Sequence, residues 1–395
     1  MSYRPIALSS VLGKLFQKIL NKRLLWFLES NNLLSPFQYG FRKGRNTAQA
    51  LLDLQNEINE AFLHKSSLYS IFFDLQEAFP RVWRQHIINK LQEFGLRGNL
   101  PRILQSFLID RKLTVRVQNT LSPPANIQNG VPQGEVLSVI LFLIAINDIT
   151  KNVKFPLTQR LFADDFNISL RSSNPHRAHR LLQNTLNSIT SWSSLNGSRF
   201  SALKTYLVIF KSRNPIPSIQ PLILQNFKIP IRSTGKLLGL HFDQKLTWTP
   251  HIKMLKSKCI SALNVIKYLS HPSKGCHRKI LLNLYKSLIR SRLDYGSPIY
   301  NTASTSVLKL LDPIQTQSLR LTLGAFCTSP SVSLCAEAAE PPLSYRRLTL
   351  TANLFASISK FPHLSAYNAI FCTGNNHSHP NKTKKNKYLL LQSYQ

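Results

Sequence analysis

Acidic side chains are scarce in this chain of 395 residues, which carries 17 Asp and Glu against 50 Lys and Arg and so a formal net charge of +33. An excess of this sign predicts a polyanionic partner, because Lys and Arg that neutralise phosphates release counterions and bind DNA or RNA in a salt-dependent way. The competing interpretation is charge that serves solubility alone. Because acidic residues are so few, the positions where they occur together are the most informative about function.

Cysteine is also sparse, with five residues and no paired spacing. This excludes a disulfide framework and indicates reduced thiols inside a cell. Cys372 lies near His377 and His379 but lacks the second cysteine of a zinc knuckle, so we expect no zinc there. The five positions are Cys259, Cys276, Cys327, Cys335 and Cys372.

Long apolar runs are absent as well. The run 136–146 is broken only by Ser138, and it is shorter than the roughly 20 residues that span a bilayer, so we expect a packed helix and no membrane partner. A hydrophobic fraction of 43% predicts a large core. Apolar residues at helical spacing between 8 and 28 predict a helix with this face toward the core. They are Leu8, Val11, Leu12, Leu15, Phe16, Ile19 and Leu20.

Two carboxylates interrupt an apolar segment at 161–170, where Asp164 and Asp165 separate two short stretches that read as strands folded back on each other. We expect their apolar neighbours to draw this hairpin into a core, where two like charges repel and lose hydration unless a divalent cation compensates. Mg²⁺ prefers such hard oxygen ligands. The alternative is a polar β-turn, since Asp is common at hairpin tips.

A second strand ends in an acid, because the β-rich run 67–73 is followed by Asp74. If the two strands lie side by side, Asp74, Asp164 and Asp165 point at one spot. That arrangement predicts a two-metal site for phosphoryl transfer, in which one ion activates a primer 3′-hydroxyl and the other stabilises the leaving pyrophosphate.

The motifs around these acids resemble, in order, those of the reverse transcriptases of non-LTR (LINE-type, jockey-like) retrotransposons. Six ordered blocks are far more specific than any single one. They are YRPIAL at 3–8, QYGFRKGRNT at 38–47, the segment 74–83, GVPQG at 130–134 with NDI at 147–149, FADD at 162–165, and KT at 204–205 with LLG at 237–239.

The resemblance implies a role for each matching residue. Asp74, Asp164 and Asp165 match the metal-binding aspartates, and the ions would be two Mg²⁺, with Mn²⁺ as an alternative. Phe79 matches the aromatic residue under the incoming sugar, although simple core packing also explains it. The residues that match the nucleotide-binding segments are Arg42, Lys43, Arg45, Gln133 and Gly134. Lys204 matches a lysine thought to protonate the pyrophosphate.

The resemblance also implies an α+β, right-hand polymerase fold with fingers, an antiparallel palm sheet and a helical thumb. We expect partial fingers at 1–66, palm at 67–248, thumb at 249–300, a helical region at 301–372 and a basic, flexible tail at 373–395. Within these we expect a helix at 176–195, strands at 205–210 and 237–242, a loop at 214–221 and helices from His251 onward.

The implied activity is an RNA-directed DNA polymerase acting on an RNA template, a DNA primer and deoxynucleoside triphosphates, in nucleus and cytoplasm as a ribonucleoprotein. Four residues depart from the pattern, and Glu135 would add a negative charge where template and phosphates should lie. The four are Glu77, Pro80, Glu135 and Val139. Because the chain begins just before Tyr3, we expect a truncated copy. The alternatives are a catalytically inactive nucleic-acid-binding remnant and, less well matched, a group II intron maturase.

Overall fold

The computed structural model describes residues 6–201, 203–213, 215–271, 273–362 and 364–372. The chain forms two compact units that interleave along the sequence. The first takes Met1–Asn46, Tyr69–Val208 and Pro217–Arg232, and the second takes Thr47–Leu68, Ile209–Ile216 and Ser233–Gln395. The start of the YRPIAL motif and the predicted basic tail lie outside the described residues, as do His377 and His379. The predicted fingers, palm and thumb boundaries stay predictions.

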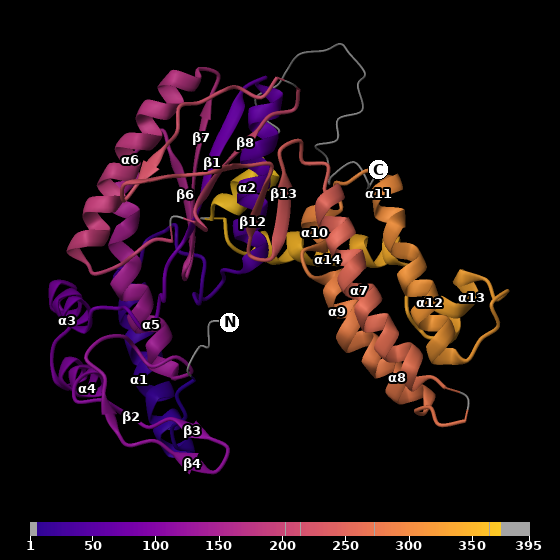
Figure 1. Cartoon of the computed structure of the whole chain (residues 1–395), viewed down its shortest axis with the longest axis horizontal. Coiled ribbons are helices and arrows are strands. Elements are labelled where there is room, and N and C mark those ends of the chain that lie inside the picture. The colour runs from indigo at the N-terminus through magenta and orange to yellow at the C-terminus, as the bar shows by residue number, and fades with distance from the viewer. Residues whose placement is uncertain (1–5, 202, 214, 272, 363, 373–395) are drawn as a thin grey trace. The chain divides into compact units, whose positions relative to one another are not determined.

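A five-stranded sheet organises the first unit, in the order β11-β8-β1-β7-β6 (Figure 1). Its strands are β1 (Ser67–Asp74), β6 (Thr158–Phe162), β7 (Asp165–Ser172), β8 (Tyr206–Phe210) and β11 (Ile231–Arg232). β6 and β7 form the predicted antiparallel hairpin, with Phe162 opposite Asp165. An antiparallel palm sheet was expected; β6 and β7 pair in this way, and at one edge the two-residue strand β11 pairs parallel with β8.

Buried side chains fix β1 against β7. Every residue of β1 except Asp74 is buried, which accounts for its unbroken apolar and small-residue sequence. Phe73 packs on Phe166 of β7 with ring centroids 5.0 Å apart. The Asn167 side-chain amide donates hydrogen bonds to Ser70 Oγ (2.8 Å) and to the Ile71 carbonyl (2.9 Å). The register of these two strands is therefore set a few residues from the acids at their ends.

The helices of the first unit are α1 (Val11–Ser30), α3 (Arg84–Glu93), α4 (Asn99–Leu108), α5 (Val136–Ile146), the 3₁₀ helix η1 (Asn147–Asn152) and α6 (Pro175–Leu195). α6 packs against β7, and α5 packs against α1 and α3. Both α5 and α6 were predicted within one residue of their observed bounds. Among the helices that the structure describes, none is long and apolar enough to cross a membrane.

Three two-stranded ladders complete the first unit. They are β2 (Lys112–Leu113) with β5 (Ala125–Asn126), β3 (Arg116–Val117) with β4 (Thr120–Leu121), and β9 (Ile223–Leu224) with β10 (Phe227–Lys228).

The helix predicted at 8–28 is present as α1, but its predicted inner face is wrong. Val11, Leu12, Phe16 and Ile19 are exposed, and Leu20 alone of the predicted set is buried, together with Gln17, Leu24 and Leu28. Both sides of this helix carry apolar residues, so periodicity established the helix without identifying the side that packs.

The second unit is mostly helical, as predicted from His251 onward. Its strands, β12 (Thr234–Leu237) and β13 (Leu240–Asp243), correct the single strand expected at 237–242: Leu238 and Gly239 take positive φ angles of 45° and 85° and turn the chain between them. Its longer helices are α2 (Thr47–Leu63), α7 (Thr249–Leu269), α8 (Arg278–Leu284), α12 (Asp312–Leu323), α13 (Ser331–Glu337) and α14 (Leu343–Ile358).

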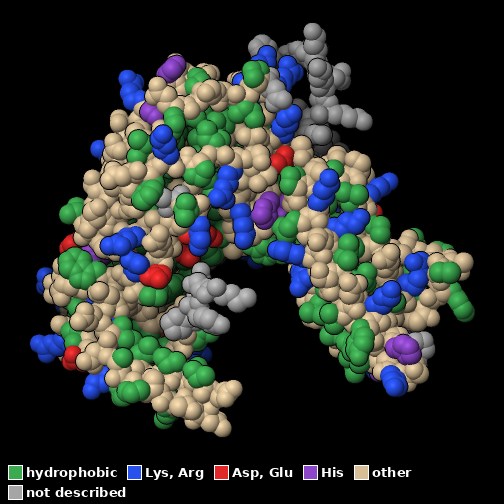
Figure 2. Space-filling view, in the orientation of Figure 1, with side chains coloured by type: hydrophobic (Ala, Val, Ile, Leu, Met, Phe, Trp, Pro, Cys, Tyr) green, Lys and Arg blue, Asp and Glu red, His purple; other side chains and the backbone are tan. Residues whose placement is uncertain are grey.

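The remaining elements of this unit are short. They are η2 (Tyr285–Arg290), α9 (Ser291–Asp294), α10 (Ser297–Tyr300), α11 (Thr305–Leu308), η3 (Lys309–Leu311), α15 (Ser365–Tyr367) and η4 (Asn368–Cys372). α7 packs against β13, α12 and η2, and its residues Ile252, Leu255 and Ile266 are buried. Figure 2 shows Lys and Arg side chains spread over the visible face of the molecule, with few acids among them.

Candidate active site

The turn of the β6–β7 hairpin carries the paired acids. Ala163 takes a positive φ of 53°, and Asp164 and Asp165 follow it. Leu161, Ala163 and Phe166 are buried as predicted. The acids are not in the core, however, since Asp164 is half-buried and Asp165 is exposed. The expectation of a desolvated carboxylate pair is therefore wrong, because the chain reverses at the end of the sheet and both carboxylates fall beyond the buried strands.

Asp74 is the last residue of β1, the strand next to β7. Its backbone N–H donates to Thr205 Oγ1 (3.3 Å), and its carbonyl accepts from the Ser201 N–H (2.8 Å). Its carboxylate Oδ2 lies 3.7 Å from Lys204 Nζ, and the two side chains are 41% and 72% exposed. The segment that carries Lys204 is thus hydrogen-bonded to the end of β1, which places the predicted acid–base lysine beside the predicted metal ligand.

The three aspartates lie at the ends of adjacent strands, and their oxygens are the ligands that Mg²⁺ prefers. Within the described ranges, no three His, Cys, Asp or Glu side chains converge closely enough to hold a metal ion by themselves. Mg²⁺ sites in phosphoryl-transfer enzymes usually take one or two carboxylates and complete their shell with water and substrate phosphates. The half-buried to exposed carboxylates fit such a site, in which the substrate supplies the remaining ligands.

Gln38 supports the turn in a way that the sequence did not reveal. Its side chain is 1% exposed, and Oε1 accepts from the N–H groups of Gly40 (2.9 Å) and Ala163 (3.1 Å). The Tyr39 N–H also donates to the Leu161 carbonyl (2.7 Å). The QYGF segment therefore runs along the outer edge of β6 and holds the residue before Asp164.

Gly40 makes this close approach feasible. A Cβ atom at position 40 would lie 2.9 Å from the Ala163 backbone nitrogen and 3.3 Å from the Phe162 carbonyl carbon. Both distances are tighter than ordinary contacts, so a larger residue would push the segment away from the turn. The motif itself was the available signal, but it had been assigned only to contacts with a nucleotide.

The basic residues of the same motif differ in their surroundings. Arg42 forms a bidentate pair with Glu29, with Nε–Oε1 and Nη2–Oε2 distances of 2.7 and 2.6 Å, and its Nη1 donates to the Ser35 carbonyl at 2.7 Å. This guanidinium is 8% exposed and anchors the motif to α1. Lys43 is exposed.

Arg45 is half-buried, and its Nη1 donates to the carbonyls of Pro36 and Gln38. Burial, together with the Arg42 charge, lowers the pKa of Arg45 to about 10, which leaves it charged at neutral pH. Arg42 and Arg45 thus have protein partners that would compete with a triphosphate, and their nucleotide contact stays a prediction.

Phe79 is half-buried and stacks on Phe142 of α5, with ring centroids 4.7 Å apart and an interplanar angle of 23°. Its carbonyl accepts from the Val131 N–H at 2.9 Å. The Gln133 carbonyl accepts from the Ala7 N–H at 2.7 Å, and Gly134 has a φ of 102°. The ring stacking shows that Phe79 packs on α5. The Ala7–Gln133 hydrogen bond shows that the Gln133–Gly134 loop closely approaches residues 6–7.

Glu135 does not project into open space as expected. Its side chain is 4% exposed, and Oε2 accepts from Gln17 Nε2 (2.5 Å) and Ser9 Oγ (2.9 Å). The expectation that its charge would face template and phosphates is wrong, because the start of α5 packs against α1 and encloses this side chain. Of the other departures, Glu77 pairs with Arg81 at 2.7 Å, Pro80 is exposed and Val139 is half-buried.

Comparison with known proteins adds to these observations. The family model for reverse transcriptase (RNA-dependent DNA polymerase) matches residues 1–263. A probable RNA-directed DNA polymerase from transposon BS of Drosophila melanogaster is 28% identical over 325 residues, which cover 81% of this chain and 36% of that protein. The RNA-directed DNA polymerase from the mobile element jockey of the same species is 29% identical over 332 residues, or 82% and 36% of the two chains.

A solved structure, apo telomerase from Candida tropicalis, aligns over 89% of this chain and 60% of its own with 13% identity and a TM-score of 0.46, a similarity too low to support an inference. The chain spans about a third of the length of the curated relatives it matches. With the family model covering most of the chain and the ordered motifs all present, the chain belongs to the reverse transcriptase (RNA-dependent DNA polymerase) family.

Proposed function

We propose that this chain contains the catalytic segment of an RNA-directed DNA polymerase, which extends a DNA primer on an RNA template with deoxynucleoside triphosphates. The observation that carries the proposal is the arrangement of Asp74 and the Asp164–Asp165 turn at the ends of neighbouring strands. The formal net charge of +33 supports a nucleic-acid partner.

In this proposal Asp74, Asp164 and Asp165 hold two Mg²⁺ ions. When bound, such a pair neutralises charge on the attacking and leaving oxygens of an in-line phosphoryl transfer. The chain's own contribution is to position the three carboxylates: burial of β1 and β7 fixes the strand ends that carry them, and the carboxylates lie half-buried or exposed there.

Lys204 is proposed to donate a proton to the leaving pyrophosphate. An ammonium group beside the ligands can reach the phosphate that they orient, and general acid catalysis of this kind contributes about 10²–10⁴-fold. Phe79 is proposed to lie under the incoming sugar, where its stacking on Phe142 would hold the ring against a 2′-hydroxyl.

A second candidate is a nucleic-acid-binding protein without catalysis. The excess of Lys and Arg supports it equally. The two candidates differ in what the aspartates do, because catalysis needs their carboxylates and nonspecific binding does not.

The test is primer extension on poly(rA) with an oligo(dT) primer, dTTP and Mg²⁺, repeated with Mn²⁺. We expect Asp164→Ala, Asp165→Ala to lower the rate by about three orders of magnitude or more. The matched control is Glu337→Ala, which removes an exposed acid of the second unit and should leave extension unchanged.

Binding to the same primer–template is measured at two salt concentrations alongside. Loss of extension in the double variant with salt-sensitive binding retained supports the polymerase. Binding by all three proteins without extension by any of them supports the second candidate and overturns the first.

A further inference from the structure

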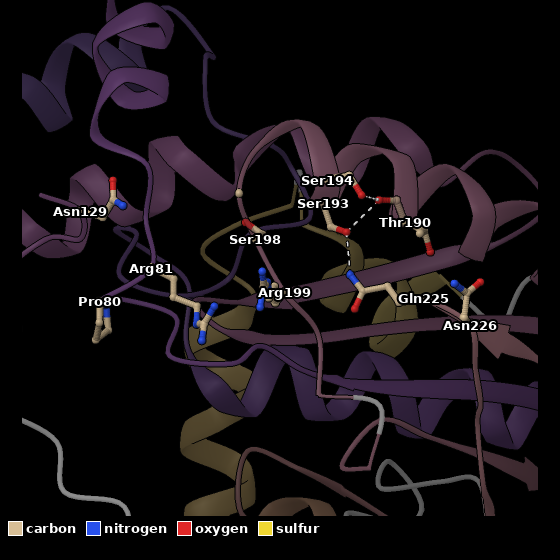
Figure 3. Close-up of a pocket in the computed structure, with 11 residues that line it drawn as sticks. Pro80, Arg81, Asn129, Thr190, Ser193, Ser194, Ser198, Arg199, Gln225 and Asn226 are labelled. Carbon is tan, nitrogen blue, oxygen red and sulfur yellow. Dashed lines mark hydrogen bonds between the residues drawn. The ribbon is translucent and has the colours of Figure 1, made fainter.

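A polar cavity of about 630 Å³ opens beside the C-terminal end of α6 (Figure 3). Its volume lies within the roughly 300–1,000 Å³ of small-ligand sites. α6 supplies the hydroxyl groups of Thr190, Ser193 and Ser194, and the segment after it supplies Ser198 and Arg199. Arg81 enters from the segment that follows β1.

The lining predicts an oxygen-rich anion as the ligand. It combines two guanidinium groups with hydroxyl and side-chain amide groups, Pro80 is its one sizeable apolar residue, and it includes no Asp or Glu. Guanidinium groups favour phosphate oxygens because their N–H groups form charge-assisted, paired hydrogen bonds. The Ser193 and Ser194 hydroxyls already donate to the Thr190 carbonyl, and Gln225 Nε2 donates to Ser193 Oγ, so the two guanidinium groups are the main donors that this lining offers to a ligand.

Both arginines are available to a ligand. Arg199 is exposed, and throughout the described part of the chain no side chain forms an ion pair with its guanidinium. Arg81 pairs with Glu77 at 2.7 Å, but these side chains are 36% and 63% exposed, and such a surface pair contributes little. Figure 3 shows the Arg81 side chain extending toward Arg199.

The wall opposite the arginines is held in place by its own hydrogen bonds. Ser193 is fully buried, donates to the Thr190 carbonyl (2.8 Å) and accepts from Gln225 Nε2 (2.9 Å). Gln225 and Asn226 form the turn between β9 and β10, with positive φ angles of 50° and 68°. Three separate segments therefore meet at this cavity in a fixed arrangement.

The cavity adjoins the catalytic strand. The Arg199 carbonyl accepts from the Gln76 N–H (2.9 Å), and Phe200 pairs antiparallel with Leu75, the residue directly after Asp74. The N–H of Ser201, two residues after Arg199, donates to the Asp74 carbonyl (2.8 Å). The backbone segment that carries Arg199 is thus hydrogen-bonded to the end of β1.

We propose that this cavity, which we call the α6 cavity, binds a phosphate-bearing anion through Arg81 and Arg199, as a site separate from the three aspartates. Its phosphate could come from free pyrophosphate or a nucleotide, or from the backbone of a nucleic acid. Binding at this site does not require polymerase activity, so its test is independent of the proposed function.

The test measures pyrophosphate binding by isothermal titration calorimetry without primer, template or divalent metal, and binding of a labelled single-stranded oligonucleotide by anisotropy. The variants are Arg199→Gln and Arg81→Gln, Arg199→Gln, which keep polar side chains and remove charge. The matched control is Arg177→Gln, an exposed arginine at the other end of α6 that does not line the cavity.

We expect Arg199→Gln to weaken pyrophosphate binding about tenfold, the double variant to weaken it further, and Arg177→Gln to leave it within about twofold. If pyrophosphate binds too weakly to measure but Arg199→Gln weakens the oligonucleotide about tenfold more than Arg177→Gln does, the phosphate source is a nucleic acid. The proposal is overturned if the cavity variants and the control give equal affinities for both ligands.

Discussion

Two groups of acids in the first unit differ in exposure and in their partners. Asp74, Asp164 and Asp165 lie half-buried or exposed at the ends of strands. Glu135 is 4% exposed between Gln17 and Ser9, whereas the side chain of Asp148 is 13% exposed, with Lys90 and Lys151 at 2.5 and 2.8 Å.

The pKa of Asp148 shows what a carboxylate gains when it is enclosed with donors. Burial by itself raises this pKa, but the hydrogen bonds and charges of Lys151 and Lys90 outweigh it and hold the pKa below its usual value. Glu135 and Asp148 are enclosed with donors, whereas Asp74, Asp164 and Asp165 lie at strand ends and are more exposed to solvent. The comparison thus separates structural acids, which are enclosed with donors, from the acids at the strand ends.

The largest expected effect on stability comes from the structural group. Glu135→Ala should lower the free energy of unfolding by about 3 kcal/mol, because it leaves the buried Gln17 amide without an acceptor and removes a charge-assisted hydrogen bond. Glu135→Gln keeps an acceptor oxygen of similar shape and should cost about 1 kcal/mol. Urea unfolding of the two variants measures the difference. Equal losses would mean that Glu135 fills space and that its hydrogen bonds add nothing.

Much of the sheet could be predicted from the sequence because its signals are local. β1, the β6–β7 hairpin and α5 each come from a nearly continuous apolar run with a polar residue at its end, and the acids at two of those ends were found this way. That β1 and β7 lie side by side was a condition of the two-metal prediction, and the sheet order confirms it, since the two strands are neighbours. Packing between distant segments had no such signal.

Gln38 and α1 show where local reasoning stops. Gln38 contacts the N–H of Ala163, 125 residues further along, and nothing near either residue reveals that partner. α1 is apolar on more than one side, so its period predicts the helix but only its packing on α5 selects Leu20, Leu24 and Leu28. The burial of Glu135 likewise depends on α1, a segment more than 100 residues away in the sequence. The sequence near Glu135 therefore did not reveal that its charge is enclosed.

A test at Gln38 can sharpen this comparison between the two groups of acids. Gln38 is a buried neutral residue whose side chain holds the turn that carries Asp164 and Asp165. Gln38→Met removes the acceptor of the Gly40 and Ala163 N–H groups and should cost about 2 kcal/mol of stability. It should also lower primer extension about tenfold and raise the Mg²⁺ concentration needed for half-maximal rate, as for residues that orient metal ligands.

The matched control is Gln159→Met. Gln159 is a buried glutamine of β6 that is 5% exposed, and its amide donates to the Thr150 carbonyl at 2.9 Å, away from the turn. It should lose comparable stability with an unchanged Mg²⁺ dependence. If both variants shift the Mg²⁺ dependence alike, Gln38 contributes to folding only and does not position Asp164.

The smallest expected effect on stability is at Asp74 itself. Its carboxylate lies 3.7 Å from Lys204 with both side chains well exposed, and ion pairs of this kind contribute about 0.5 kcal/mol or less. A double-mutant cycle of Asp74→Asn and Lys204→Gln, followed by urea unfolding, should therefore give a coupling below about 0.5 kcal/mol. In primer extension, by contrast, Asp74→Asn should abolish measurable product. A coupling above about 1 kcal/mol would place Asp74 among the structural acids, beside Glu135 and Asp148. A small coupling combined with lost extension means that the carboxylate at the end of β1 is needed for primer extension and not for the stability of the fold.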